Sequence, residues 1–202
     1  MNLFDYDSTL NLLPFDGEAN YFGCVFSHQD AQHYLNNLIN TIKWNNDKLK
    51  IYGKEITTKR KVAWHGDSDY AYTYSNVTRH AKAWTNELLE LKTIVEKLTN
   101  VKYNSCLLNL YQNGDESMSW HSDNEKSLGV NTNIASLSFG AERKFSLKHK
   151  ANKQTVSLIL ESGSLLVMKG ETQTNWVHSL PKMKNINTPR INLTFRTYID
   201  YK

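Results

Sequence analysis

Polar and apolar residues alternate without interruption along Arg190-Ile191-Asn192-Leu193-Thr194-Phe195-Arg196. Successive side chains of a β-strand point to opposite faces of its sheet. The three apolar residues therefore predict a face buried in a core, and the four polar residues predict a face that lines a polar site. That polar face carries two guanidinium groups, those of Arg190 and Arg196.

Two guanidinium groups on one face suit a small dicarboxylic acid. A guanidinium binds a carboxylate through two parallel, charge-assisted hydrogen bonds, so Arg190 and Arg196 would hold such an acid at both ends. A solvated sheet edge or a patch that contacts phosphates would show the same pair of arginines. The choice between these interpretations depends on what else the chain carries.

Upstream of this strand, the chain offers a set of metal ligands. His121 and Asp123 are two residues apart, so on a strand or at its end they share one face, and His178 follows 55 residues later in the alternating segment Trp176–Leu180. Two imidazoles and one carboxylate form the facial triad that holds iron(II) and leaves positions open. A single His-x-Asp is also common by chance. Together with the arginine pair, the triad predicts an oxidative enzyme that uses iron(II), oxygen and the dicarboxylate 2-oxoglutarate.

Length and composition fit one compact domain. The chain has 202 residues, of which 40% are hydrophobic and 11% aromatic, enough for a sizeable core. We expect an unsecreted protein without a membrane segment, since no apolar run approaches the roughly 18 residues that span a bilayer. Cys24 and Cys106 lie among apolar neighbours without metal-type spacing, which predicts two buried thiols in a reducing compartment. The net charge of +4 permits nucleic acid binding without demanding it.

Apolar spacing predicts two helices followed by many short strands. The helices span 27–41 and 83–98, and Ser27 offers a cap for the first. The strands expected after residue 105 span 106–111, 134–139, 144–148, 155–160, 164–168, 176–180 and 190–198. This order predicts an α+β fold in which helices buttress a double-sheet jelly roll with the metal in its mouth. Residues 1–20 match no motif, so they would form a tail or pack on the domain.

Several segments together resemble the AlkB-like iron(II)/2-oxoglutarate dioxygenases, the alkylation-repair demethylases. In chain order they are Leu108-Asn109-Leu110-Tyr111, Trp120-His121-Ser122-Asp123-Asn124-Glu125, Ala135-Ser136-Leu137-Ser138-Phe139-Gly140-Ala141, Gly163-Ser164-Leu165-Leu166-Val167-Met168, Trp176-Val177-His178-Ser179-Leu180-Pro181 and Pro189 through Arg196. The resemblance extends from about residue 50 to residue 198. It implies a double-stranded β-helix core over 105–198, and within the family it is strongest to the branch that repairs duplex DNA.

The resemblance also assigns the cosubstrate pocket. His121, Asp123 and His178 would hold iron(II). Asn109 and Tyr111 would hydrogen-bond 2-oxoglutarate, with Tyr111 and Arg190 at its far carboxylate. The metal-binding end would lie near Asn192, Thr194 and Arg196.

The substrate residues are expected in the first half of the chain. Residues 48–80 resemble an apolar finger and a nucleotide-recognition lid, in which Ile51 and Tyr52 would fill the gap left by an extruded base. A plain hairpin with both side chains in the core is the alternative from composition. Tyr74 and His121 would sandwich the base. Ser75 and Glu125 would approach the edge of the base, Tyr72 belongs to the lid, and Arg60 would contact a phosphate. Arg143, Lys148, His149 and Lys150 would reach the complementary strand.

The substrate expected from these residues is N1-methyladenine or N3-methylcytosine in duplex DNA, demethylated by a monomer in the nucleus of a eukaryote or the cytoplasm of a bacterium. A carboxylate such as that of Glu125 suits these bases because they carry a positive charge. Asn124 stands where some relatives have a second acid, which leaves the substrate range open. Three alternatives remain: demethylation of RNA or single-stranded DNA, oxidation of a protein or lipid, and noncatalytic binding of damaged DNA.

Overall fold

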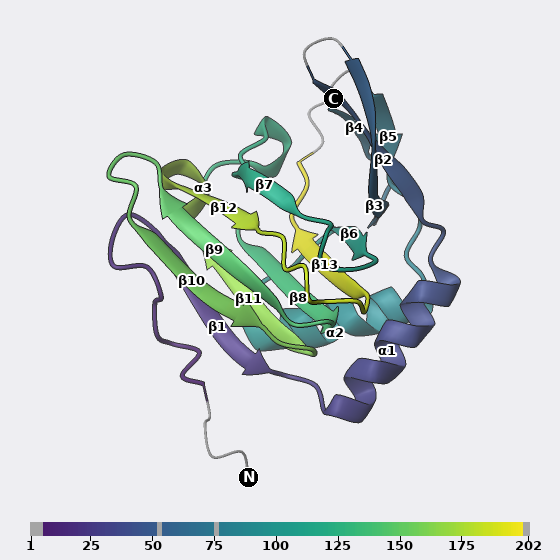
Figure 1. Ribbon diagram of the computed structural model, residues 1–202, viewed down its shortest axis with the longest axis horizontal. Coiled ribbons are helices and arrows are strands. Elements are labelled where there is room, and N and C mark those ends of the chain that lie inside the picture. Colours follow the sequence, from purple (N-terminus) through teal and green to yellow (C-terminus); the bar gives the residue numbers. More distant parts are fainter. Residues whose placement is uncertain (1–5, 52–53, 75–76, 200–202) are drawn as a thin grey trace.

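Two antiparallel sheets and two flanking helices make up the architecture (Figure 1). The structure is a computed structural model that describes residues 6–51, 54–74 and 77–199. No helix within these ranges is long and apolar enough to cross a membrane. The α+β fold with a double-sheet core that the sequence predicts is confirmed.

The larger sheet has seven strands in the order β1-β11-β8-β13-β6-β3-β2. Its strands are β1 (Glu18–Cys24), β2 (Asn45–Ile51), β3 (Lys54–Gly66), β6 (Ser105–Tyr111), β8 (Ile134–Gly140), β11 (Ser164–Lys169) and β13 (Arg190–Arg196). The alternating strand β13 lies at the centre, between β8 and β6. The polar face of β13 therefore has a strand on each side, β8 and β6, whose side chains can contribute to a site.

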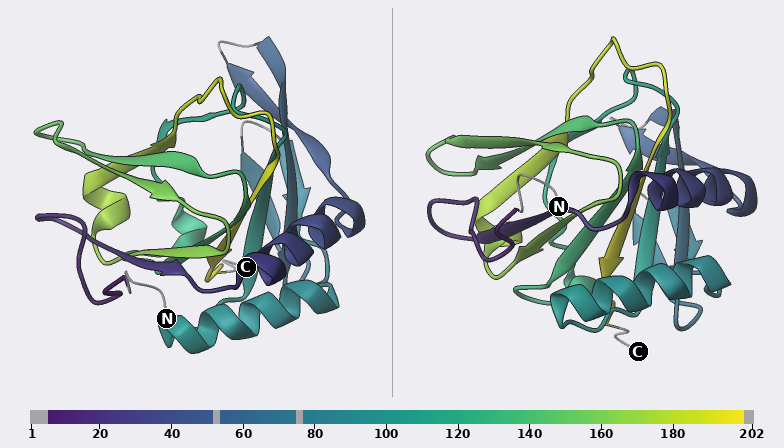
Figure 2. Two further views of the ribbon diagram at one scale, coloured as in Figure 1. Left: turned by 60° about the horizontal axis from the view of Figure 1, so that its bottom comes forward. Right: turned by 90° about the horizontal axis from the view of Figure 1, so that it is seen from below.

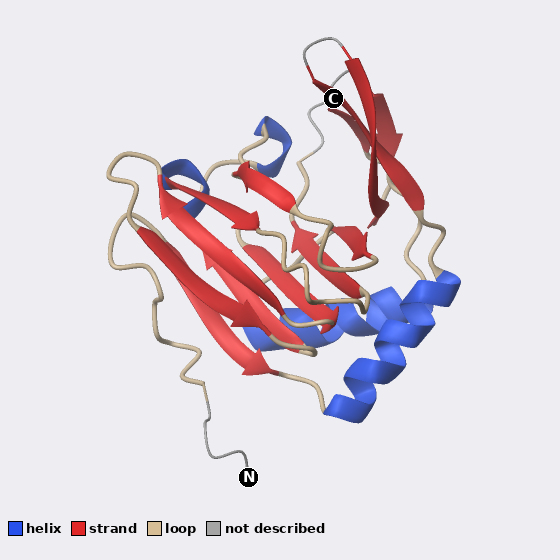
Figure 3. Cartoon of the chain, viewed as in Figure 1, coloured by secondary structure: helices blue, strands red, loops and turns tan. Residues whose placement is uncertain are grey.

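The smaller sheet has four strands in the order β10-β9-β12-β7. Its strands are β7 (Met118–His121), β9 (Arg143–His149), β10 (Thr155–Leu160) and β12 (Trp176–Leu180). A two-stranded sheet of β4 (Ala71–Tyr74) and β5 (Val77–His80) stands apart from both. Figure 3 shows in red how the strands of the two larger sheets lie across from one another.

The helices α1 (His28–Thr41) and α2 (Asn86–Thr99) cover the outer face of the larger sheet (Figure 2). Each begins at a capping side chain, because the hydroxyls of Ser27 and Thr85 accept from the backbone N–H groups of Asp30 and Leu88. The core beneath them includes the apolar residues of β13, which are fully buried. The short helices Lys126–Leu128 and α3 (Thr172–Asn175) lie in the connections.

A second core fills the space between the sheets on the side of β1. Leu13, Phe145, Leu166 and Trp176 belong to it. The described residues up to 20 thus pack on the fold and contribute Leu13 and the start of β1, so a tail is wrong for them. Cys106 is buried as expected, whereas Cys24 at the end of β1 is exposed, and both thiols are free.

The β2–β3 hairpin extends past the rest of the larger sheet. Strand β3 has 13 residues, but only Lys61–Gly66 pair with β6, while the part nearer the turn pairs with β2 alone. Figure 1 shows this hairpin as a projecting arm beside β4 and β5. Ile51 ends β2 at the turn, and Tyr52 lies outside the described residues.

Candidate functional site

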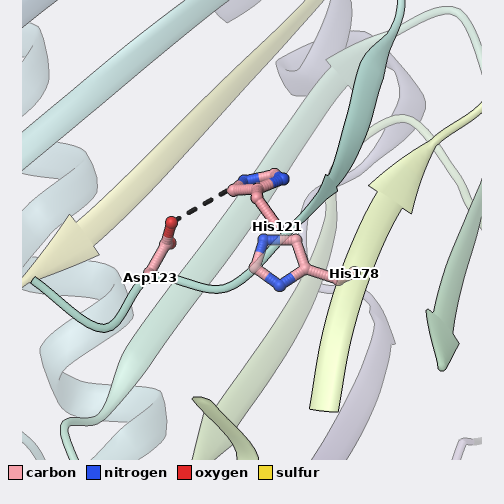
Figure 4. A group of neighbouring side chains, drawn as sticks. All are labelled: His121, Asp123 and His178. Atoms are coloured by element: carbon pink, nitrogen blue, oxygen red, sulfur yellow. Dashed lines mark ion pairs between the residues drawn. The ribbon is translucent and has the colours of Figure 1, made fainter. Parts of the chain in front are cut away.

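The three predicted metal ligands meet between the sheets. His121 is the last residue of β7 and lies opposite His178 in β12, while Asp123 follows in the loop after β7 (Figure 4). One ligand atom of each residue lies within 4.8 Å of those of the other two. The spacing expected from the sequence therefore brings two imidazoles and one carboxylate together, with Asp123 beyond the strand end.

Both imidazoles present an unprotonated nitrogen for a metal. The Nδ1 of His121 lies 2.8 Å from the carbonyl oxygen of Ser119, which places the proton on Nδ1 and leaves Nε2 as the ligand. Its Nε2 lies 3.7 Å from Asp123 Oδ1. Burial lowers the pKa of His178 to about 3, which keeps this imidazole neutral at physiological pH.

Asp123 is held from two sides. Its Oδ2 accepts from Arg196 Nη2 at 2.6 Å, and its backbone N–H donates to Gln173 Oε1 at 2.9 Å. Burial raises the pKa of this carboxyl, but the charge and the hydrogen bond of the Arg196 guanidinium outweigh that effect, so the pKa lies below its usual value. Asp123 is therefore a carboxylate with Oδ1 turned towards the histidines.

Arg190 occupies the far end of the polar face of β13. It is 2% exposed, its Nη2 donates to Ser138 Oγ at 2.9 Å, and its guanidinium carbon lies 5.6 Å from the centre of the Tyr111 ring. Burial lowers its pKa to about 10, so the group is still a cation at neutral pH. Within the described residues its Nε has no hydrogen-bond partner. A buried cation with an unused donor fits an incoming carboxylate.

The middle of this face is a hydrogen-bonded row of side chains. Asn192 donates to Ser136 Oγ at 2.8 Å and accepts from Thr194 Oγ1 at 3.0 Å. On the neighbouring strand, Asn109 accepts from Arg60. These polar side chains lie between the metal ligands and Arg190, along the path that a bound dicarboxylate would follow.

A cavity of about 440 Å³ extends from the metal ligands at one end to Arg190 at the other. Its lining includes all three metal ligands, the polar face of β13, Asn109 and Tyr111 from β6, and apolar side chains of both sheets, among them Met118, Phe145, Met168 and Leu180. A larger hollow of about 530 Å³ lies elsewhere, against Tyr6, Tyr21 and Ile159. It contains none of the ligand set, so the smaller cavity is the candidate site.

The residues present fit both groups that the sequence predicts. Two imidazoles and one carboxylate are the donor set of a facial iron(II) site. The unpartnered Nε of buried Arg190 and the nearby ring of Tyr111 fit a carboxylate at the other end of the cavity. Arg196 contributes at the metal end, where it already binds Asp123.

The expected substrate residues lie on three parts of the fold. Arg60 and Glu125 line the cavity. Tyr72 and Tyr74 belong to β4, and their side chains, like that of Ile51, are outside the described part of the structure. Ser75 lies outside the described residues altogether.

The predicted basic surface group on and after β9 does not form as expected. Arg143 is fully buried and donates to the carbonyl oxygens of Asn113, Glu116 and Pro181, so the expected DNA contact is wrong for this residue. His149 is also buried. Lys150 donates to two carbonyls at α3, and only Lys148 keeps its ammonium group on an exposed aromatic ring, that of Trp120.

Sequence reasoning missed the side chains that support the ligands. Gln173 binds the backbone of Asp123 from a position 50 residues away, and no local pattern marks that contact. Trp120 lines the cavity and is 42% exposed. The sequence feature that could have pointed to Trp120 is its position directly before His121.

Comparisons with known proteins agree with this site. The family model for the 2OG-Fe(II) oxygenase superfamily matches residues 18–196. A solved structure described as "The structure of OsALKBH1" superposes with a TM-score of 0.57, covering 84% of this chain and 91% of its own. At 16% identity, that likeness supports the fold alone.

Relatives with curated names are much more similar in sequence. "Alpha-ketoglutarate-dependent dioxygenase alkB homolog 3" of Bos taurus is 44% identical over 148 residues, 68% of this chain and 51% of the relative. "DNA oxidative demethylase ALKBH2" of Mus musculus is 37% identical over 163 residues, 77% of this chain and 68% of the relative. The matched part of this chain thus spans about half of the first relative's length and about two thirds of the second's. It belongs to the AlkB-like branch of the 2OG-Fe(II) oxygenase superfamily.

Proposed function

We propose that the protein oxidatively demethylates N1-methyladenine and N3-methylcytosine in DNA, including duplex DNA. The observation that carries the proposal is a single cavity in which the triad of His121, Asp123 and His178 faces a buried Arg190. Relatives whose names specify DNA oxidative demethylation support the choice of substrate. A nuclear location in a eukaryote, or a cytoplasmic one in a bacterium, belongs to the same proposal.

The triad would hold iron(II), and Arg190 with Tyr111 would hold the far carboxylate of 2-oxoglutarate. Together with oxygen, these groups supply the oxidation that turns the N-methyl group into formaldehyde while 2-oxoglutarate becomes succinate and carbon dioxide. The protein needs no nucleophile for this reaction. Its own side chains orient the cosubstrate and exclude water from the buried site.

Glu125 is the proposed recognition group for the damaged base. It lines the cavity four residues after His121, so a base that enters near the metal meets its carboxylate. Methylation at N1 of adenine or N3 of cytosine gives the ring a positive charge, and a carboxylate favours this charged ring over a normal base. We propose that the base lies between the rings of Tyr74 and His121, with Ser75 near its edge, Tyr72 in the lid and Arg60 as a phosphate contact.

The projecting β2–β3 hairpin supports action on duplex DNA. It extends beyond its pairing with β6, and its turn comes directly after Ile51. We propose that Ile51 and Tyr52 enter the base stack and replace the extruded nucleotide. An inserted apolar wedge offsets part of the few kcal/mol that unstacking costs.

The test is mass spectrometry of an oligonucleotide that carries one N1-methyladenine. The protein is incubated with iron(II), ascorbate and oxygen, with and without 2-oxoglutarate, on duplex DNA, single-stranded DNA and RNA. Loss of one methyl group that depends on 2-oxoglutarate supports the demethylase. An iron-loaded protein that demethylates none of the three would overturn it.

A further inference from the structure

An exposed aromatic residue directly precedes the proposed metal ligand His121 on β7 and belongs to the lining of the metal cavity. This residue, Trp120, has 42% of its surface exposed. The ammonium nitrogen of Lys148 lies 4.1 Å from the centre of its ring. Trp120 comes from β7 and Lys148 from β9, with β12 between these strands, so the lysine reaches across a whole strand to cover the indole.

The roles proposed in the cavity leave Trp120 unused, and Lys148, which the resemblance assigns to the complementary strand, lies over the Trp120 ring. Iron, 2-oxoglutarate and the damaged base are assigned to other side chains of the lining. Tryptophan is a large apolar residue, and an exposed one beside a site is typical of a binding surface. An indole ring with a neighbouring cation matches the chemistry of a nucleotide, which offers a flat base and a phosphate.

We propose that Trp120 and Lys148 bind the nucleotide next to the damaged one when the substrate is single-stranded. The neighbouring base stacks on the exposed indole, and the ammonium group of Lys148 contacts the phosphate between the two nucleotides. This inference rests on the proposed function, since it needs a methylated base in the cavity. It adds activity on single strands to the duplex activity proposed for the hairpin.

The partner is an unpaired strand because only an unpaired base has a face to offer. In a duplex, the base beside the lesion is stacked and paired, and the hairpin fills the gap that the extruded base leaves. In a single strand, no paired stack holds the base beside the lesion. That base can therefore stack on an aromatic platform. The hairpin and the platform therefore serve two forms of the same substrate.

The experiment compares the kinetics of four variants with those of the parent protein. Trp120→Ala removes the ring, Trp120→Phe keeps a smaller ring, and Lys148→Ala removes the cation. Lys97→Ala, on the exposed side of α2, is the control for loss of one positive charge. Demethylation is measured on one sequence containing N1-methyladenine, both as a single strand and as a duplex, with 2-oxoglutarate saturating.

Trp120→Ala is expected to raise the ratio of the single-strand KM to the duplex KM about tenfold, with kcat little changed. Trp120→Phe should restore most of the affinity. Lys148→Ala should raise the same ratio, and the effect should shrink as salt increases. A Trp120→Ala variant whose KM rises equally on both substrates, or on neither, would overturn the platform.

Failure of the demethylase proposal remains distinguishable from failure of the platform. Fluorescence anisotropy with a labelled single strand that carries one N1-methyladenine, under anaerobic conditions and without 2-oxoglutarate, measures platform binding without turnover. If the parent protein demethylates nothing, weaker binding by Trp120→Ala than by Lys97→Ala still supports the platform. Equal binding by these two variants counts against it.

Discussion

Arg196 Nη2 donates to Asp123 Oδ2 at 2.6 Å, so the end of β13 fixes a proposed metal ligand that lies 73 positions earlier in the chain. Asp123 is buried and Arg196 is partly buried, with 7% of the carboxylate side chain and 14% of the arginine side chain exposed. Removal of one partner from such a pair leaves a charge without compensation. The arginine therefore controls the charge of the metal site as well as the position of Asp123.

Arg196→Gln should destabilise the metal-free protein by about 3 kcal/mol or more, because Asp123 would be left buried and unpaired. Bound iron(II) would neutralise that carboxylate, so saturating metal should recover part of the loss. Urea denaturation under anaerobic conditions, with and without iron(II), measures both effects. A loss of stability that metal does not reduce would contradict this role.

Replacement of Asp123 or His178 by Ala should abolish turnover while the fold persists. Each side chain supplies one of three ligands, so iron(II) affinity should fall by more than the roughly 10- to 100-fold that loss of a supporting residue costs. Metal titration and circular dichroism separate binding from folding. Retained 2-oxoglutarate-dependent demethylation by either variant would refute the triad.

Arg190→Lys should weaken the binding of 2-oxoglutarate and leave the binding of the oligonucleotide unchanged. The lysine keeps the charge but loses the paired donors, and charge-assisted hydrogen bonds contribute about 1.5 to 3 kcal/mol, which corresponds to roughly 10- to 100-fold in KM. The KM for the methylated oligonucleotide, measured at saturating 2-oxoglutarate, is the internal control. Equal increases in both constants would point to a general loss of structure.

Arg143→Ala should reduce stability and leave the contacts to nucleic acid intact. Its guanidinium joins the carbonyls of Asn113, Glu116 and Pro181, and loss of these contacts from a fully buried position should cost on the order of 3 kcal/mol. The comparison with Lys148→Ala is informative, since that variant should keep its stability and lose affinity for single strands. The reverse pattern would restore Arg143 as a DNA contact.

His65 should make the protein sensitive to acid. Burial lowers its pKa, and its Nδ1 donates to the Ala83 carbonyl oxygen at 2.7 Å. Because the folded pKa is below the unfolded value of about 6.5, the unfolded state takes up the proton first and stability falls as pH drops below that value, by up to about 1.4 kcal/mol per unit. Denaturation midpoints between pH 7 and 5 should therefore fall less steeply in His65→Gln. Exposed His33→Gln is the control, and an unchanged slope in His65→Gln would exclude the effect.

The parts of the fold that follow a short-range period could be predicted from the sequence. The alternation of β13 assigned its two faces correctly, and the predicted cap at Ser27 places the start of the first helix. The second helix was predicted from residue 83, but it begins at Asn86, after a cap at Thr85 that the prediction did not include. Strand β1 was missed because Asn20 and Gly23 interrupt its apolar pattern, and its pairing with β11 comes from residues more than a hundred positions away. Tertiary pairing, not local preference, makes that strand.

The candidate site could likewise be predicted only in part from the sequence. The metal ligands could be predicted because their chemistry restricts residue type and spacing. The burial of Arg143 could not, since the three carbonyls that surround it are brought together by loops after β6 and β12. A basic residue among other basic residues suggested a surface, and only the path of the backbone shows otherwise.

The hairpin of β2 and β3 occupies the edge of the larger sheet, whereas the cosubstrate face is built on β13 and β6 inside it. Under the proposed function, exchanges in the arm would alter which nucleic acid is bound without moving the proposed metal ligands or the polar face of β13. Chimeras that exchange only residues 45–59 between relatives leave Arg60, which lines the cavity and donates to Asn109, in place and test whether the arm directs the choice of target. The catalytic machinery is thereby free to stay constant while the targets diversify.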